Sequence, residues 1–129
     1  MSGIAYHTQN DRCMPPRMLT VFADAPARRA AHEAFAASAP EGVSQDAASV
    51  TEAVLALLAG RFDLVLVDVG WAGDLLQALL RHVRRSAPQA RLIGFATQAQ
   101  AAAPGGLREV HDWSELPEVL AGLHCAAVR

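Results

Sequence analysis

The chain has 129 residues and a mass of 13.7 kDa, which suits one domain with a single hydrophobic core. A formal charge of −2 gives no general attraction for nucleic acid, and 52% hydrophobic against 19% charged residues excludes a disordered chain. No apolar run is long enough to span a membrane, and the polar N-terminus does not look like a signal peptide. Together with two widely spaced cysteines, Cys13 and Cys125, expected to be free thiols, this predicts a cytoplasmic protein.

The first part of the chain predicts a leader, a strand and a helix. Residues 1–17 are polar and rich in breakers, which predicts a flexible leader before a domain over residues 18–129. The domain opens with the short apolar run Met18–Ala23, a predicted strand that is closed by the carboxylate of Asp24. A proline in the first turn then favours a helix over residues 27–38.

A second strand and helix follow. Val43–Ala47 fits a short edge strand. Ser49 and Glu52 have the spacing of a capping box, and Gly60 ends the helix that they begin. The apolar face of this helix repeats at helical spacing and consists of Val50, Ala53, Val54, Leu57 and Leu58.

The most informative stretch lies in the middle of the chain. Leu64–Val67 is a run of four large aliphatic residues, too short for an independent helix and alternating with β-branched side chains. This pattern predicts a strand that is buried on both faces, as in the centre of a parallel sheet. The run ends in Asp68, with Gly70 two residues later. Because ligands of open α/β sheets bind at the carboxyl ends of the strands, we expect Asp68 to line a functional crevice.

The remaining elements continue the alternation. Leu75–Val83 predicts an amphipathic helix, and Arg91–Ala96 predicts another buried strand. Residues 97–106 hold one or two helical turns at most, and Leu107–Val110 is the predicted last strand. Asp112 or Ser114 then caps a final predicted helix. The apolar face of this helix consists of Leu116, Val119, Leu120 and Leu123. Alternating strands and helices predict an α/β fold of three layers, a parallel sheet with helices on both faces.

Two predicted strands end in carboxylates, Asp24 and Asp68. If these strands are neighbours in a parallel sheet, both side chains emerge at the same edge, where they repel one another unless a cation lies between them. An oxygen-rich edge of this kind suits Mg²⁺, and the backbone carbonyl of Gly70 offers a further oxygen. Trp71 and Trp113 fall in loops at that edge, where each either covers the core or closes the pocket.

At this point the chain resembles the receiver domain of bacterial two-component response regulators. The resemblance is strongest in the stretches SVTEAVLALLAGRFDLVLVDVG and GDLLQALLRHVRRSAPQARLIGFAT. It implies a flavodoxin-like (βα)5 fold and transfer of a phosphoryl group from a histidine kinase to an aspartate that ends the third strand. By position, Asp68 resembles the phosphoacceptor, Asp24 the Mg²⁺-binding acid, and Gly70 the residue that lends its carbonyl to the metal.

The chain also departs from the family pattern. Ala23 replaces the first member of an acidic pair, and Thr97 or the preceding alanine takes the place of a Thr or Ser after the fourth strand. His111 stands where the family has a lysine, and the helix between the fourth and fifth strands is shortened. A neutral imidazole pairs poorly with a phosphorylated aspartate, and one acid fewer weakens Mg²⁺ binding. The resemblance therefore implies an altered site.

Three functional readings follow, and none of them makes the chain an enzyme. The first is a phosphoaccepting receiver of a phosphorelay that acts through protein–protein contacts, and the second is a pseudo-receiver that is never phosphorylated. The third, a small flavodoxin-like cofactor or nucleotide binder, lacks a glycine-rich loop after the first strand. A hydrolase is disfavoured because no Ser or Cys is predicted beside a base. Partners are a histidine kinase or another signalling protein, with no nucleic acid or membrane, and a homodimer would use the Leu75–Val83 or Leu116–Leu123 helices.

Overall fold

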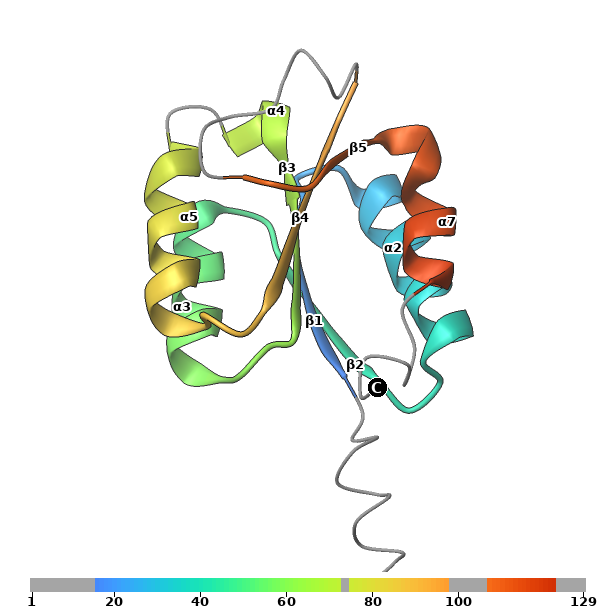
Figure 1. Cartoon of the computed structure of the whole chain (residues 1–129), viewed down its shortest axis with the longest axis horizontal. Coiled ribbons are helices and arrows are strands. Elements are labelled where there is room, and N and C mark those ends of the chain that lie inside the picture. The colour runs from blue at the N-terminus through green and yellow to red at the C-terminus, as the bar shows by residue number, and fades with distance from the viewer. Residues whose placement is uncertain (1–15, 73–74, 98–106, 123–129) are drawn as a thin grey trace, which may run out of the picture.

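In a computed structural model, residues 16–72, 75–97 and 107–122 are described. They form one parallel five-stranded sheet with the order β2-β1-β3-β4-β5 (Figure 1). The elements are β1 (Arg17–Val21), α2 (Ala25–Ser38), β2 (Val43–Ala47), α3 (Val50–Ala59), β3 (Leu64–Asp68), α4 (Val69–Ala72), α5 (Leu75–Ser86), β4 (Arg91–Ala96), β5 (Val110–Asp112), the 3-10 helix η1 (Trp113–Glu115) and α7 (Leu116–Ala121). The predicted three-layer α/β architecture is confirmed.

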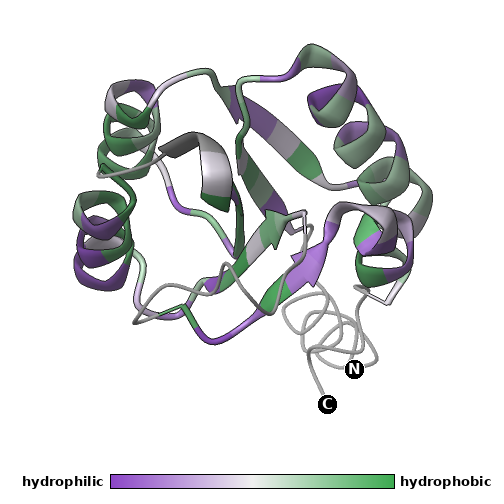
Figure 2. Ribbon diagram, turned by 90° about the horizontal axis from the view of Figure 1, so that it is seen from above, coloured by the Kyte–Doolittle hydropathy of each residue, from purple (hydrophilic) through white to green (hydrophobic). Residues whose placement is uncertain are grey.

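The sheet separates two helical layers (Figure 2). Alternate residues of β3 supply both cores: Val65 and Val67 pack under α3 and α5, while Leu64 and Leu66 pack under α2 and α7. These four side chains are buried, with exposed fractions of 5% or less. The prediction of a central strand buried on both faces is therefore confirmed, and it explains why this run lacks the polar alternation of a half-exposed strand.

Helix α3 begins as predicted, and most of its predicted apolar face is turned to the core: Ala53 and Leu57 are buried, and Val50 packs against the core. The hydroxyl of Ser49 accepts the Glu52 N–H at 3.0 Å, whereas the Glu52 carboxylate accepts the N–H of Ala48 and not that of Ser49. Leu58 was expected in the apolar face, but its side chain is 66% exposed. The buried face consists of Ala53, Ala56 and Leu57, because small alanines let the helix lie close to its neighbours.

The last strand lies later in the chain than predicted. β5 pairs with β4 from Gly94↔Val110 to Ala96↔Asp112, so the prediction of a strand over Leu107–Val110 was wrong. The buried side chain of Leu107 packs on β4 instead: a Cβ built at Gly94 would stand 2.6 Å from Leu107 Cδ2. The apolar character of Leu107 reflects this contact and not membership of a strand.

The boundaries of the chain are only partly described. Arg17 already belongs to β1, and its N–H donates to the Asp63 carboxylate at 2.9 Å. Residues 1–15 of the predicted leader, residues 98–106 of the expected short helix between β4 and β5, both cysteines and Leu123 lie outside the described residues. Among the described helices, none has the length and apolarity needed to cross a membrane.

The two helices predicted to form a dimer use their apolar stripes internally. Leu76, Leu79, Leu80 and Val83 of α5, and Leu116 and Leu120 of α7, are all buried in the cores. A dimer would therefore have to use the other faces of these helices, and the homodimer stays a prediction. In the part of the chain that the structure describes, the large hydrophobic side chains that are more than half exposed belong to α3 and to the first residue of α5: Leu55, Leu58 and Leu75.

Candidate phosphoacceptor site at the carboxyl edge

The parallel sheet brings the predicted site residues to one edge. β1 and β3 are neighbours with Val21 opposite Val67, so Asp24 and Asp68 follow adjacent strands at the same end. Thr97 follows β4 at this end, and β5 also ends here. The strands that precede Asp24 and Asp68 are therefore neighbours in a parallel sheet, as the predicted pairing of the two carboxylates requires.

Asp68 is the last residue of β3 and is half-buried. Helix α4 begins at the next residue, and the Asp68 Oδ1 accepts the N–H of Gly70 at 3.1 Å. Gly70 thus contacts the carboxylate through its amide nitrogen, while the sequence predicted a role for its carbonyl oxygen. A hydrogen bond to the charged form holds a carboxylate in one orientation, which is useful for a nucleophile and equally ordinary for a residue that begins a turn.

Asp24 is exposed and is the N-cap of α2. Its Oδ2 accepts the Ala27 N–H at 3.0 Å. A capping carboxylate can still offer its second oxygen to a cation, but one oxygen is already committed. Across the described ranges there is no group of three or more His, Cys, Asp or Glu residues that could hold a metal ion. A metal at this edge would therefore depend on the pair Asp24 and Asp68, with carbonyl or water oxygens.

His111 lies in β5 between two acidic side chains. Its Nε2 is 3.0 Å from Glu109 Oε2, and its Nδ1 is 3.4 Å from Glu115 Oε1. Glu109 also accepts two hydrogen bonds from Arg91, at 2.7 and 3.0 Å. Burial alone would raise the pKa of Glu109, but the hydrogen bonds from Arg91 and His111 outweigh it and hold that pKa below its usual value. The ring nitrogens of His111 thus face two carboxylates, while the family lysine is expected to face the phosphoacceptor.

Thr97 is exposed and lies one residue beyond β4. The register pairs Asp68 with Phe95, so the first residue past that level is the buried Ala96, and Thr97 comes after it. Of the two candidates for the family's hydroxyl position, the chain therefore offers an alanine nearer to the level of Asp68 and a threonine one residue farther along.

An aromatic cluster that the sequence did not predict covers the core beside this edge. Trp113 stacks on Phe95 with ring centroids 5.4 Å apart and meets Phe22 edge-on at 5.0 Å. Phe22 immediately precedes Ala23 and Asp24, while Phe95 is the register partner of Asp68. Trp113 therefore covers the edge of the core, the first of its two predicted roles, and touches residues next to both acids.

A second polar cluster ties α2 to the edge strand β2. His32 bonds through Nδ1 to the Ser44 hydroxyl and through Nε2 to Asp46 Oδ1. Thr20, which is fully buried, donates its hydroxyl to the same Asp46 oxygen at 2.7 Å. Burial opposes ionisation of Asp46, but the bonds from His32 and Thr20 and the charges of His32 and Arg28 lower its pKa overall.

This cluster corrects the statement that no serine stands beside a base, because Ser44 does. The spacing indicates only that Ser44 and Asp46 share a face of β2, because residues two apart on a strand do so. The contact with His32 depends on how α2 packs beside β2. A Ser–His–Asp chain alone is not a hydrolase site, because acyl transfer also needs oxyanion donors and a substrate cleft. Arg28 extends the cluster toward the carboxyl edge: its Nε lies 3.8 Å from Asp46 Oδ2, and its Nη1 donates to the carbonyls of Phe22 and Ala23 at 2.8 and 3.0 Å.

Comparisons with known proteins support the fold. No protein-family model matches the sequence, and no curated protein matches it significantly. Among solved structures, the chain is similar to the phosphorylated cyanobacterial phytochrome response regulator RcpA, with a TM-score of 0.66, 16% identity, and coverage of 84% of this chain and 90% of that one. It is also similar to the REC domain of AraT, a response regulator from Geobacillus stearothermophilus, with a TM-score of 0.59, 22% identity, and coverage of 84% of this chain and 92% of that one. A structure described as adenylate cyclase from Rhodopirellula baltica has a TM-score of 0.64 and 14% identity, with coverage of 83% of this chain and 85% of that one. The fold of this chain is that of response-regulator receiver domains.

Proposed function

We propose that this chain is a divergent receiver module of two-component signalling, in which Asp68 accepts a phosphoryl group and the output is a protein–protein contact. The observation that carries the proposal is the position of Asp68 at the carboxyl end of the central strand, beside the strand that Asp24 follows. The proposal also draws on the shared fold, and it makes the chain a signalling module and not an enzyme. Its partner would be a histidine kinase in the cytoplasm.

The chemistry requires little machinery. An Asp68 carboxylate oxygen attacks the phosphorus of a phosphohistidine, the new O–P bond forms as the N–P bond breaks, and the released imidazole takes up a proton. Gly70 N–H orients the Asp68 carboxylate by its bond to Oδ1. Asp24, Asp68 and a carbonyl at Gly70 would hold Mg²⁺, which when bound neutralises phosphoryl charge. We keep Thr97 and His111 as candidates for contacting the phosphoryl oxygens.

The alternative is a pseudo-receiver with the same fold and no phosphorylation. Specific observations favour it: Asp24 already caps a helix, and His111 already lies between Glu109 and Glu115. In that case the carboxyl edge of the sheet would act as a fixed protein-binding surface. A cofactor or nucleotide binder has less support, because the loop after β1 contains no glycine for close approach of a phosphate.

The test is intact-mass measurement after incubation with acetyl phosphate and Mg²⁺. We expect an adduct of one phosphoryl group that is lost in Asp68→Asn. Asp63→Asn is the matched control, because Asp63 comes just before the opposite end of the same strand and bonds the Arg17 backbone. No adduct on folded wild-type protein would overturn phosphorylation and leave the pseudo-receiver. An adduct that survives Asp68→Asn would place the acceptor elsewhere.

A further inference from the structure

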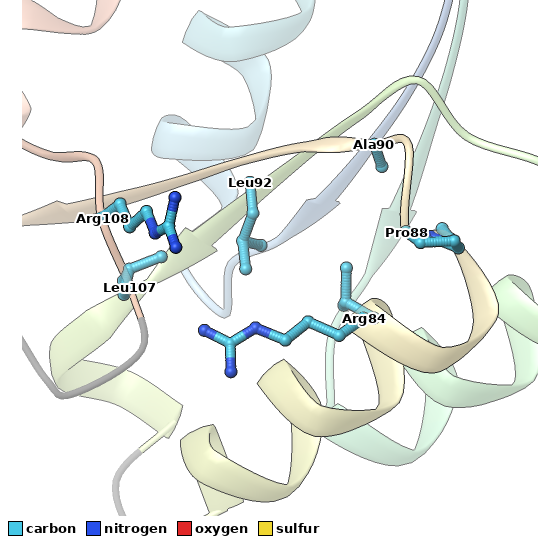
Figure 3. A pocket seen from close by; sticks show the side chains of 8 residues that line it. Arg84, Pro88, Ala90, Leu92, Leu107 and Arg108 are labelled. Atoms are coloured by element: carbon cyan, nitrogen blue, oxygen red, sulfur yellow. The ribbon is translucent and has the colours of Figure 1, made fainter.

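A pocket of about 590 Å³ lies between α5, the amino half of β4 and the segment before β5. It opens on the α5 side of the sheet, and Figure 3 shows its lining. Leu92, in its floor, pairs in register with Val65, three residues before Asp68 along β3. The pocket is therefore separate from the carboxyl edge that bears Asp24 and Asp68. The lining residues that matter here are Val83, Arg84, Pro88, Leu92, Leu107 and Arg108.

The floor of the pocket is apolar because of the way β4 is covered. β5 pairs with β4 only from Gly94 onward, so the described part of β5 does not reach the level of Leu92. Val83 and Leu107 are buried at the sides, with exposed fractions of 2% and 6%, while Leu92 is only partly buried. These aliphatic side chains leave a concave apolar surface of the kind that holds the body of a small ligand.

Two arginines enter the pocket from opposite sides. Arg84 comes from the last turn of α5 and Arg108 from the segment just before β5, and both guanidinium groups extend over the apolar floor (Figure 3). Basic residues in the last turn of a helix are favourable on their own, through the helix dipole, which accounts for Arg84 without any ligand. The dipole does not account for Arg108, which brings a second positive charge to the same space.

Arg84 and Arg108 bring two positive charges to one apolar surface, where both would attract an anionic group that lies between them. Guanidinium groups bind carboxylate and phosphate through paired hydrogen bonds, and the volume lies within the range of small-molecule sites. We propose that this pocket binds a small amphiphilic anion. Its carboxylate or phosphate head lies between Arg84 and Arg108, and its apolar body covers Val83, Leu92 and Leu107. The proposal does not depend on phosphorylation of Asp68.

The experiment is a titration of the ¹⁵N-labelled chain with octanoate and, separately, with octyl phosphate, each below its micelle-forming concentration. We expect saturable amide shifts in α5, the first half of β4 and residues 107–108. The preferred head group identifies the source of the anion as a carboxylate or a phosphate ester. Octanol is the neutral control with the same tail, and it should bind much more weakly than either anion.

The variants are chosen at exposed positions so that folding is preserved. Arg84→Gln and Arg108→Gln should each weaken binding about tenfold or more, because each removes charge-assisted hydrogen bonds. Arg85→Gln is the matched control: it makes the same charge change in the same helix but does not line the pocket. Equal binding of octanol, an equal loss in Arg85→Gln, or no saturable shift with either anion would overturn the proposal.

Discussion

Replacement of Asp46 by alanine tests whether the polar cluster on α2 and β2 stabilises the fold. The side chain of Asp46 is 43% exposed, yet it accepts a hydrogen bond from Thr20, the one polar residue that is fully buried among those described. Removing Asp46 leaves the Thr20 hydroxyl without its acceptor in the core. A buried unsatisfied hydroxyl costs about 1–3 kcal/mol, while the exposed ion pair with Arg28 contributes roughly 0–1 kcal/mol.

We therefore expect Asp46→Ala to lower the free energy of unfolding by about 2–3 kcal/mol at neutral pH. The assay is urea denaturation followed by circular dichroism, with an unchanged m-value as the check on two-state behaviour. Glu33→Ala, on an exposed position of the same helix, is the control and should change stability by less than about 0.5 kcal/mol.

A double-mutant cycle separates the hydroxyl from the charge. In a Thr20→Val background no buried hydroxyl remains, so Asp46→Ala should there cost only about 1 kcal/mol or less. The same loss in both backgrounds, or a loss below about 0.5 kcal/mol in the wild type, would refute the reasoning.

The pH dependence has a defined sign. The pKa of Asp46 is lower in the folded state than in the unfolded chain, because the hydrogen bonds and charges of its partners outweigh its burial. Its contribution to stability is therefore complete above the unfolded pKa and is lost as the pH falls through the folded pKa. The stability difference between wild type and Asp46→Asn should therefore shrink below about pH 4. A difference that stays constant down to acid unfolding would contradict this assignment.

Two further changes probe the core beside the carboxyl edge. Gly94→Ala places a Cβ 2.6 Å from Leu107 Cδ2 and 2.7 Å from Val69 Cγ2, so we expect overpacking to cost about 1–3 kcal/mol in thermal denaturation; unchanged stability would show that Leu107 moves freely. Phe95→Ala should cost about 3–5 kcal/mol and shift tryptophan emission to longer wavelength, because it removes the ring on which Trp113 stacks. An unshifted emission maximum would contradict that stacking.

The sequence predicted the fold well where local pattern and tertiary role agree. The doubly buried run at Leu64–Val67 and the strand Arg91–Ala96 have the predicted bounds because sheet burial demands continuous apolar residues there. It failed at Leu107, whose side chain is buried by packing on Gly94 and not by strand pairing. It failed at Leu58 too, because helical spacing alone does not say which of two adjacent leucines faces the sheet.

The candidate site was predictable in position but not in contacts. Parallel strands necessarily bring Asp24 and Asp68 to one edge, so their shared location follows from element order. The partners of His111 depend on the register of β5, and a strand of three residues is too short for its sequence pattern to indicate that register. Likewise Ser44 and His32 are twelve residues apart on different elements, and only the packing of α2 beside β2 brings them together.

The structural roles of Asp24 and Arg28 bear on whether phosphorylation at this edge would need a metal. Asp24 uses Oδ2 for its helix cap, and a carboxylate has a second oxygen that a cation can share. Arg28 fixes the carbonyls of Phe22 and Ala23, so the loop that bears Asp24 is held by a cation just where the family pattern has another acid. A positively charged anchor beside this edge disfavours Mg²⁺ but favours a phosphoryl group. The altered edge is thus better suited to stabilising an anion on Asp68 than to concentrating metal. The comparison of adduct formation with and without Mg²⁺ is the measurement that distinguishes these two effects: formation that depends little on Mg²⁺ is expected, and a strict requirement for the metal would contradict this argument.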